Sequence, residues 1–437
     1  MATSLIRSRR MITRTLDHDR WEEIADGAVL QKDGVIAAVG TYADLHARYP
    51  DAPVIGSGRE ILLPGFVNGH HHVGLTPVQL GSPDMPLELW FVTRMVARNL
   101  NLYLDTLYSA FEMVGSGITT VQHIHGWMPG SLEEVEARSN EVLRAYRDIG
   151  MRVSYCFAVR DQNRLVYQAD MDFVASLPAP LQDPMKRWFE RFQMSLEDNF
   201  SLFRSLHAGQ EGASRAKIQL APANLHWCSD AALEGLAGLS ESYDVPMHMH
   251  LVETAYQKAY AEKRGGGTAL EYLDRFGMLG PRLTLGHGVW LNESDIDRVA
   301  ATGTCICHNC SSNFRLRSGV AALNRFEAKG INTAIGLDEA ASTTTATCSR
   351  RCASCCAPTG CPAWTRRRAE HGAGVRMATV GGARTTPYGD GLGRSRSARA
   401  PTCPDRLGPD RLPVSRPGDA LLDAVIQRAK TGGVTAV

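Results

Sequence analysis

Short apolar segments alternate with helix-length amphipathic stretches between residues 62 and 340, and this alternation constrains the fold more than any other feature of the chain. One of the amphipathic stretches is "SDAALEGLAGLSESYD". The segments expected to form strands are residues 62–72, 118–125, 152–159, 218–224, 245–251, 283–287, 304–308 and 332–338. Eight strands that alternate with helices predict an α/β fold, a (β/α)8 barrel of the TIM type.

Polar side chains stand at the ends of these strands. Six of the eight segments end on or just before a histidine or an aspartate. In (β/α)8 barrels the active site lies at the carboxyl ends of the strands. The sequence therefore predicts that these side chains meet at one end of the barrel.

Two of the strands carry histidines at alternate positions. "LLPGFVNGHHHVGLT" contains His70 and His72, and "VPMHMHLVET" contains His248 and His250. Because residues i and i+2 of a strand point to the same face, each pair can face the barrel interior. His250 is nearer its strand end and is better placed to meet a metal. A pair of this kind can also be a surface or hydrogen-bonded core pair, but the first follows Pro-Gly and an apolar strand, which favours the site.

The later strands end on His287, His308 and Asp338. A buried carboxylate is costly unless it is paired or bound to a cation. Three imidazoles and one carboxylate suit Zn²⁺, with Fe²⁺ as the alternative. Such an ion lowers the pKa of a bound water to about 7 and so provides hydroxide at neutral pH.

Three further residues bear on the number of metals and on proton transfer. His123 and His125 form a rival pair on the second strand, which we expect to line the pocket or pack beneath it. Lys217 lies at the start of the fourth strand, away from the mouth, so no lysine is placed to bridge two metals; one metal per subunit is expected. Glu253 follows the fifth strand and is placed to carry protons, or it simply begins the next helix, where acids interact well with the helix dipole.

Composition indicates a soluble globular protein without nucleic-acid or membrane partners. Hydrophobic residues make up 44% and charged residues 21%, and the net charge is +1. No run approaches the roughly 18 apolar residues that a membrane helix needs. The first residues are basic without an apolar core behind them, unlike a secretory signal, so we expect a cytoplasmic protein.

The chain divides into six segments. Residues 1–61 alternate apolar runs with turns, as in "GAVLQKDGVIAAVG", and predict the N-terminal part of a small β-sandwich subdomain. Residues 62–340 are the barrel. Residues 341–374 are expected to be read in a wrong frame, 375–393 to be a helical remnant, 394–417 to be a second frame-shifted segment, and 418–437 to be a truncated C-terminal part of the β subdomain.

The frame hypothesis rests on codon logic. Residues 341–374 contain no Leu, Ile, Val, Met or Phe. Read one nucleotide earlier, each cysteine codon becomes one for Leu, Met or Val. The positions of Cys348, Cys352, Cys355 and Cys356 then form the apolar stripe of a helix. Disorder and a cysteine metal site are the alternatives; only Cys352 and Cys355 have the spacing of a zinc knuckle.

With these residues identified, the chain resembles the amidohydrolase superfamily, in its branch of cytosine-deaminase-like and chlorohydrolase-like aminohydrolases. The motifs are "PGFVNGHHH", "HMHLVET", "LGHGV" and "GLDEA", in the family's order, and the likeness covers about residues 4–340. The resemblance implies that His70, His72, His250 and Asp338 bind one metal. It further implies a small-molecule substrate and a homodimer.

The resemblance also implies roles for the neighbouring residues. Glu253 would move protons to the substrate ring and the leaving group, and general acid–base work suits a glutamate beside a metal. His287 would polarise the substrate or orient the hydroxide, and Asp338 would also take the proton of the attacking water. The implied reaction is the hydrolytic release of ammonia from an amino-substituted purine, pterin, pyrimidine or triazine ring.

Two other functions stay open: hydrolysis of an amide or C–Cl bond at the same metal, and an inactive barrel that only binds a ligand. Glu253 favours the deaminase, because expelling ammonia needs a proton donor and expelling chloride does not. Candidate substrate contacts are Trp90, Arg160, Gln162, His226 and Asn313, each of which could equally be a packing or surface residue.

Overall fold

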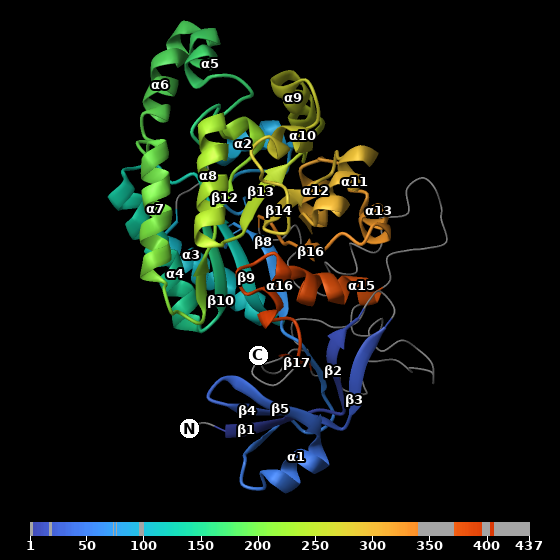
Figure 1. Cartoon of the computed structure of the whole chain (residues 1–437). Helices are drawn as coiled ribbons and strands as arrows, with labels where there is room; N and C mark the ends of the chain where they lie inside the picture. Colours follow the sequence, from blue (N-terminus) through green and yellow to red (C-terminus); the bar gives the residue numbers. More distant parts are fainter. Residues whose placement is uncertain are drawn as a thin grey trace.

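The computed structural model describes residues 3–16, 20–72, 74–75, 77–95, 100–339, 371–395 and 403–405. Figure 1 shows a large α/β part next to a smaller β-rich part, with the last described helices between them. Among these residues, none of the helices combines the length and the apolar character that crossing a membrane requires.

Parallel strands of the large part close into a barrel. They are β8 (Phe66–His71), β9 (Ile118–His125), β10 (Arg152–Val159), β11 (Ala216–Ile218), β12 (Ala221–Pro222), β13 (Met247–Leu251), β14 (Leu283–His287), β15 (Cys305–His308) and β16 (Thr333–Ile335). Two sheets run from β8 to β12 and from β13 to β16. Parallel bridges join them, Leu220 with Met247 and His71 with Asp338. Because β11 and β12 together form the fourth strand, the predicted (β/α)8 barrel is confirmed.

The first and last strands differ from the expected segments. Residues 61–63 form a separate strand, β7 (Ile61–Leu63), which belongs to the β-rich part. The break falls at Pro64, which has no N–H to donate to a ladder, and at Gly65, where a Cβ would come within 2.3 Å of Thr119 Oγ1. The last strand, β16, ends at Ile335, and beyond it the N–H of Asp338 donates to His70 O at 2.8 Å.

Helices follow most of the strands. They are α2 (Leu87–Met95), α3 (Leu102–Val114), α4 (Leu132–Ile149), α5 (Asp170–Ser176), α6 (Ala179–Phe189), α7 (Leu196–Gly209), α8 (Asp230–Tyr243), α9 (Ala255–Gly265), α10 (Ala269–Asp274), α11 (Glu293–Thr302), α12 (Cys310–Arg315) and α13 (Leu323–Ala328). Several begin with a reciprocal cap, such as Ser131 with Glu134 and Asn292 with Asp295. Such caps satisfy N–H groups that the first turn leaves unbonded.

The β-rich part contains two four-stranded sheets. Its strands are β1 (Thr3–Arg7), β2 (Arg10–Thr15), β3 (Trp21–Ala25), β4 (Gly27–Lys32), β5 (Val35–Thr41), β6 (Val54–Ile55), β7 and β17 (Cys403–Asp405), with α1 (Tyr42–Arg48) after β5. The sheet orders are β5-β4-β1-β6 and β17-β7-β2-β3. The hairpin between β4 and β5 turns at Asp33 (φ 50°) and Gly34 (φ 80°), as the sequence predicted.

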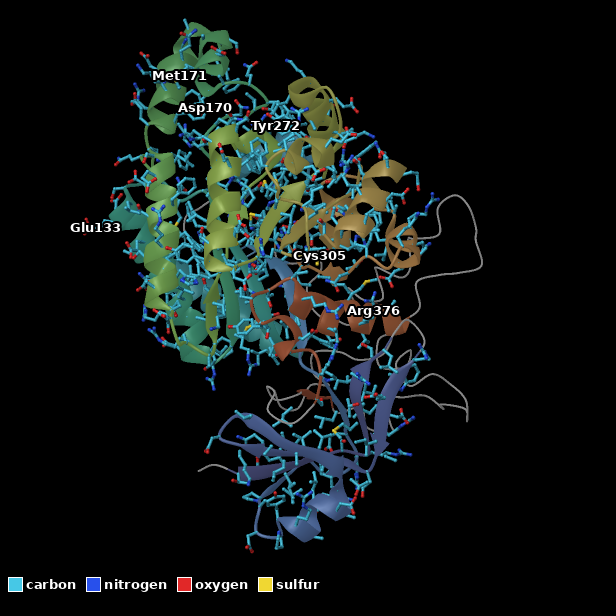
Figure 2. All side chains as sticks on the ribbon, in the orientation of Figure 1. Glu133, Asp170, Met171, Tyr272, Cys305 and Arg376 are labelled. Carbon is cyan, nitrogen blue, oxygen red and sulfur yellow. The ribbon has the colours of Figure 1, made fainter. Side chains whose placement is uncertain are left out.

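A C-terminal helical segment packs against the barrel. It consists of α15 (His371–Arg376), a π-helical turn η2 (Met377–Gly381), α16 (Gly382–Arg384) and a 3₁₀ turn η3 (Gly389–Gly391). Asn332 donates to Gly381 O at 3.2 Å, and Arg376, labelled in Figure 2, pairs with Glu327 at 2.8 Å. Because α15 includes His371, helix is present before the expected boundary at residue 375. The expectations for residues 341–370, 396–402 and 406–437 fall outside the described residues.

Candidate active site

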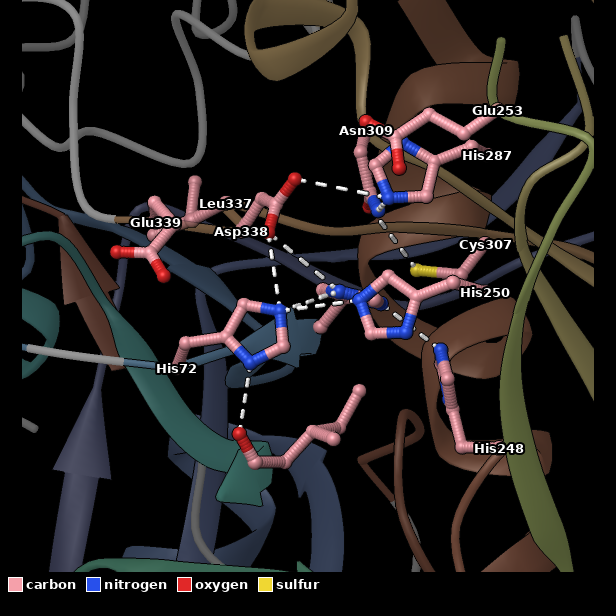
Figure 3. A network of polar contacts seen from close by, with 12 residues as sticks. His72, His248, His250, Glu253, His287, Cys307, Asn309, Leu337, Asp338 and Glu339 are labelled. Atoms are coloured by element: carbon pink, nitrogen blue, oxygen red, sulfur yellow. Dashed lines mark hydrogen bonds and ion pairs between the residues drawn. The ribbon is translucent and has the colours of Figure 1, made fainter. Parts of the chain in front are cut away.

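Imidazole and carboxylate groups from four strands meet at the mouth of the barrel (Figure 3). His70, His250, His287 and Asp338 are buried, and each offers a ligand atom within 4.8 Å of the others. His72 joins the same group, because its Nε2 lies 3.0 Å from His70 Nε2, 3.2 Å from His250 Nε2 and 3.1 Å from Asp338 Oδ1. Five of the residues that the sequence singled out are thus brought to one point.

Backbone carbonyls orient two of these imidazoles. His72 Nδ1 donates to Ile124 O at 2.7 Å, and His250 Nδ1 donates to Ala223 O at 2.9 Å. Since each neutral ring then carries its proton on Nδ1, its Nε2 lone pair faces the centre. His248 lies behind the centre, with its Nε2 2.9 Å from His70 Nδ1.

Asp338 carries the negative charge of the centre. Burial would raise its pKa, but the hydrogen bonds of His70 and His72 and the charges of His70 and His287 hold the pKa well below its usual range. Its backbone has φ 58°, and His287 has φ 72°. Positive φ values are unfavourable for such residues and are found where the surrounding structure enforces them, often at functional sites.

Two asparagines hold His287. Its Nδ1 donates to Asn313 Oδ1 at 2.8 Å, and its Nε2 accepts from Asn309 Nδ2 at 3.2 Å and lies 3.6 Å from Asp338 Oδ2. Asn313 is buried behind His287. The geometry gives it a positioning contact with His287, where the sequence suggested a contact with substrate.

Glu253 reaches over the centre from the end of β13. It follows Val252, which has φ 42°, and its carboxylate accepts from Ser318 Oγ at 3.3 Å. Burial, helped by the charges of Asp338 and Glu88, raises the pKa of Glu253 to about 7, although His287 opposes the shift. A carboxyl group of this kind can hold a proton near neutral pH.

A cavity of about 510 Å³ opens above these groups. This volume is within the range of small-molecule sites. His72, His250, Glu253, His287 and Asp338 line one end. Aromatic side chains line the wall, among them Trp90, Phe91, Trp127 and Trp227.

The candidate substrate contacts divide into two groups. Trp90 and Arg160 line the cavity. Gln162 instead donates to His226 O and Cys228 O, and the His226 ring packs on Trp227 and Tyr167. These two residues therefore shape the wall behind the cavity.

The rival pair also lies at the cavity. His123 and His125 both line it and stack on each other, with Nε2 of the first 3.2 Å from Nδ1 of the second. His123 Nδ1 lies 2.8 Å from Tyr146 Oη. This matches the expectation that the pair lines the pocket. His308 is buried on β15, outside the central group.

Sequence reasoning missed several charged groups at the cavity, among them Glu339 and Arg94. Glu339 follows Asp338 directly and also faces the cavity, as does Arg94 from α2. The motif "GLDEA" carried a signal for Glu339, because neighbouring residues of an irregular turn can both face one space. Nothing in the local sequence marked Arg94.

Comparisons with known proteins agree with this geometry. Residues 61–394 match the family model described as amidohydrolase family, and residues 27–52 match an imidazolonepropionase-like composite domain of bacteria. The chain is 30% identical over 329 residues to 8-oxoguanine deaminase of Pseudomonas aeruginosa, which covers 73% of this chain and 68% of that protein. It is 28% identical over 421 residues to 5-methylthioadenosine/S-adenosylhomocysteine deaminase of Nitratidesulfovibrio vulgaris, covering 92% and 84%.

A third relative is 5'-deoxyadenosine deaminase of Methanothermobacter thermautotrophicus, 28% identical over 324 residues, covering 73% of this chain and 66% of the relative. Among solved structures, a zinc-bound adenosine deaminase from Xanthomonas campestris superposes with a TM-score of 0.81 at 23% identity, covering 99% of this chain and 90% of the other. A zinc complex of atrazine chlorohydrolase from Arthrobacter aurescens superposes with a TM-score of 0.80 at 20% identity, covering 99% and 95%.

These matches confirm the predicted relationship to deaminases with chlorohydrolase neighbours, and with it a hydrolase acting on carbon–nitrogen bonds outside peptides. The family model covers most of the barrel and its C-terminal helical segment. The chain belongs to the amidohydrolase family.

Proposed function

We propose that the protein is a mononuclear zinc aminohydrolase that releases ammonia from an amino-substituted nitrogen heterocycle, with a purine-type ring as the first choice. The observation that carries the proposal is the convergence of buried imidazoles and Asp338 beneath Glu253 in one cavity. The named relatives that act on adenine nucleosides and on 8-oxoguanine support the choice of ring.

The donor set fits a small divalent cation. The lone pairs of His72 and His250 face each other with their Nε2 atoms 3.2 Å apart, an arrangement that is repulsive unless a cation lies between them. Zinc–nitrogen bonds of about 2.0–2.1 Å place the ligands of a tetrahedral site about 3.3 Å apart. The separations of 3.0 to 3.5 Å among His70, His72, His250 and Asp338 are close to that value.

We assign His70, His72, His250 and Asp338 as the ligands. His248 supports the assignment, because a His70 that donates from Nδ1 to His248 Nε2 leaves its own Nε2 free for the ion. Burial lowers the pKa of His70 to about 4, which favours the neutral, ligating form. When bound, such an ion makes hydroxide available near neutral pH. The choice between zinc and iron rests on the donor set, which suits zinc first.

The chain's own residues then carry the proton steps. Asp338, an anion next to the attack site, accepts the proton of the attacking water. Glu253 holds a proton near neutral pH and delivers it to the ring nitrogen and the departing amine. His287 is held by Asn313 and Asn309 so that its ring faces Asp338, which places it beside the attacked carbon.

The test is ammonia release by the zinc-loaded protein across amino-substituted purines, pterins, pyrimidines and triazines. Ammonia from any of these rings supports the proposal, and the ring that reacts fastest defines the pocket. If metal is bound and no ring yields ammonia, the same centre acts on an amide or a C–Cl bond instead. If metal does not bind, the barrel is inactive.

A further inference from the structure

Glu339 presents to the cavity a carboxylate oxygen, Oε2, that has no hydrogen-bond donor among the described residues. Its side chain is 14% exposed, and Oε2 is buried and accepts no hydrogen bond from the residues that the structure describes. The separation from Arg94 Nε is 3.9 Å, which is beyond hydrogen-bond distance. Leaving a carboxylate oxygen buried without a donor is costly, so the site suits a ligand that brings an N–H group.

Hydrogen bonds hold the backbone around Glu339, whereas its side chain lines the cavity. Asp338 N donates to His70 O at 2.8 Å on one side. On the other side Arg315 donates to Glu339 O at 3.4 Å and is itself held by three hydrogen bonds from its Nε and Nη2 to Asp84. These contacts hold the main chain of Glu339 next to the cavity.

Glu253 and Glu339 lie on opposite sides of Asp338 (Figure 3). Both line the same cavity. A flat ring whose reacting carbon lies next to Asp338 therefore has Glu253 along one edge and Glu339 along another. Glu253 is used for proton transfer in the proposed reaction, whereas Glu339 has no part in it.

We propose that Glu339 accepts a hydrogen bond from a second N–H donor of the substrate, such as a further amino group on the ring. The protein then selects heterocycles that carry a second amino group over matched rings that carry only one. This inference rests on the proposed function for the placement of the ring. A site built to bind an N–H group rejects an analogue that lacks it, because its own polar atom is left unbonded.

One other role for Glu339 fits the same contacts. The long pair with Arg94 connects the end of β16 to α2, whose Trp90 and Phe91 also line the cavity. Glu339 would then latch α2 over the site, and its removal would weaken every ligand equally.

Binding of matched rings separates the two roles. Dissociation constants are measured by calorimetry on zinc-loaded full chains that all carry Glu253→Gln, so that the rings are bound without being deaminated, for two ring pairs, adenine with 2,6-diaminopurine and 4-aminopyrimidine with 2,4-diaminopyrimidine. With wild-type Glu339 the diamino member binds more tightly by roughly 10- to 100-fold, the usual effect of a hydrogen bond to a charged group. Glu339→Leu removes this preference, and Arg94→Gln, the control, keeps it.

Two results overturn the inference: a wild type without the preference, or a Glu339→Leu protein that retains it. Equal weakening of all four rings by Glu339→Leu and by Arg94→Gln establishes the latch instead. If Glu339→Leu fails to fold by circular dichroism, Glu339→Gln, which removes the charge at nearly constant volume, takes its place. Ammonia release is measured separately on the wild type. If the diamino rings bind more tightly but no ring releases ammonia, the proposed deaminase reaction is refuted, whereas the proposed hydrogen bond from the ring to Glu339 is retained.

Discussion

Glu253 Oε1 lies 3.6 Å from His287 Nδ1, but that nitrogen gives its proton to Asn313 at 2.8 Å. Among the described residues, the hydrogen bond recorded for the carboxyl of Glu253 is the one from Ser318 Oγ, at 3.3 Å. A group that is buried, weakly hydrogen-bonded and next to the proposed metal is suited to exchange its proton with a substrate.

Glu253→Gln is expected to keep the metal and lose most of the activity. The amide has nearly the same shape but cannot transfer the proton, and such transfers contribute about 10²- to 10⁴-fold to rates. Metal content by mass spectrometry and ammonia release check the two halves of the prediction. Unchanged turnover would remove the proton-transfer role.

Glu253 should also make the stability of the metal-free protein depend on pH. Because burial raises its pKa to about 7, the folded state keeps a proton that the unfolded state releases near its ordinary pKa. Stability contributed by this group is therefore lost as pH rises from about 4.5 to 7, by up to about 3 kcal/mol. Urea unfolding in the presence of a chelator gives the free energy of unfolding of the wild type and of Glu253→Gln at pH 5 and pH 8. Relative to the wild type, Glu253→Gln should be more stable at pH 8 than at pH 5. An equal difference in the free energy of unfolding at both pH values would contradict the assignment.

Asn313→Leu is expected to lower kcat by about 10- to 100-fold with little loss of metal, because the His287 ring loses the acceptor that fixes its tautomer. Asn140→Leu, the same change at an exposed position on α4, is the matched control. If Asn313 contacted substrate directly, KM would rise and kcat would change less. Steady-state kinetics with the reactive ring distinguish the two.

Arg160→Met is expected to stabilise the protein by about 1 kcal/mol and to raise KM. The guanidinium stacks on Trp227 at 3.7 Å and Trp127 at 4.3 Å, yet its Nε and Nη1 are buried without a hydrogen-bond partner among the described residues. Methionine keeps the packing and removes the charge. Thermal unfolding and KM are compared with those of Arg164→Met, a change at the neighbouring arginine that pairs with Asp170.

Sequencing the gene tests the frame hypothesis for residues 341–374. We expect a shifted frame in which Cys348, Cys352, Cys355 and Cys356 are replaced by aliphatic residues. The protein from the repaired gene should unfold at a higher temperature than the chain as printed. One unbroken frame in the DNA would refute the hypothesis.

Local pattern was enough for most of the barrel. Residues 118–125, 152–159 and 283–287 are strands with the expected bounds. Short runs rich in apolar and β-branched residues between helix-length amphipathic stretches show their limits without knowledge of the neighbouring strands. Sequence also determined the candidate ligands, since alternate positions of one strand share a face whatever lies opposite.

Tertiary structure decided how these side chains work together. His250 reaches the centre with its Nδ1 held at 2.9 Å by the carbonyl of Ala223, which directly follows another strand, β12. Asn313 accepts a hydrogen bond from His287, and Glu339 faces the cavity. Both arrangements depend on contacts between segments far apart in the chain. Closure of the barrel brings residues 70 and 338 together through the His71–Asp338 bridge. The local sequence pattern does not predict a contact between residues so far apart in the chain. The sequence by itself determined which groups stand at the strand ends, whereas the closed barrel decided which of their atoms meet.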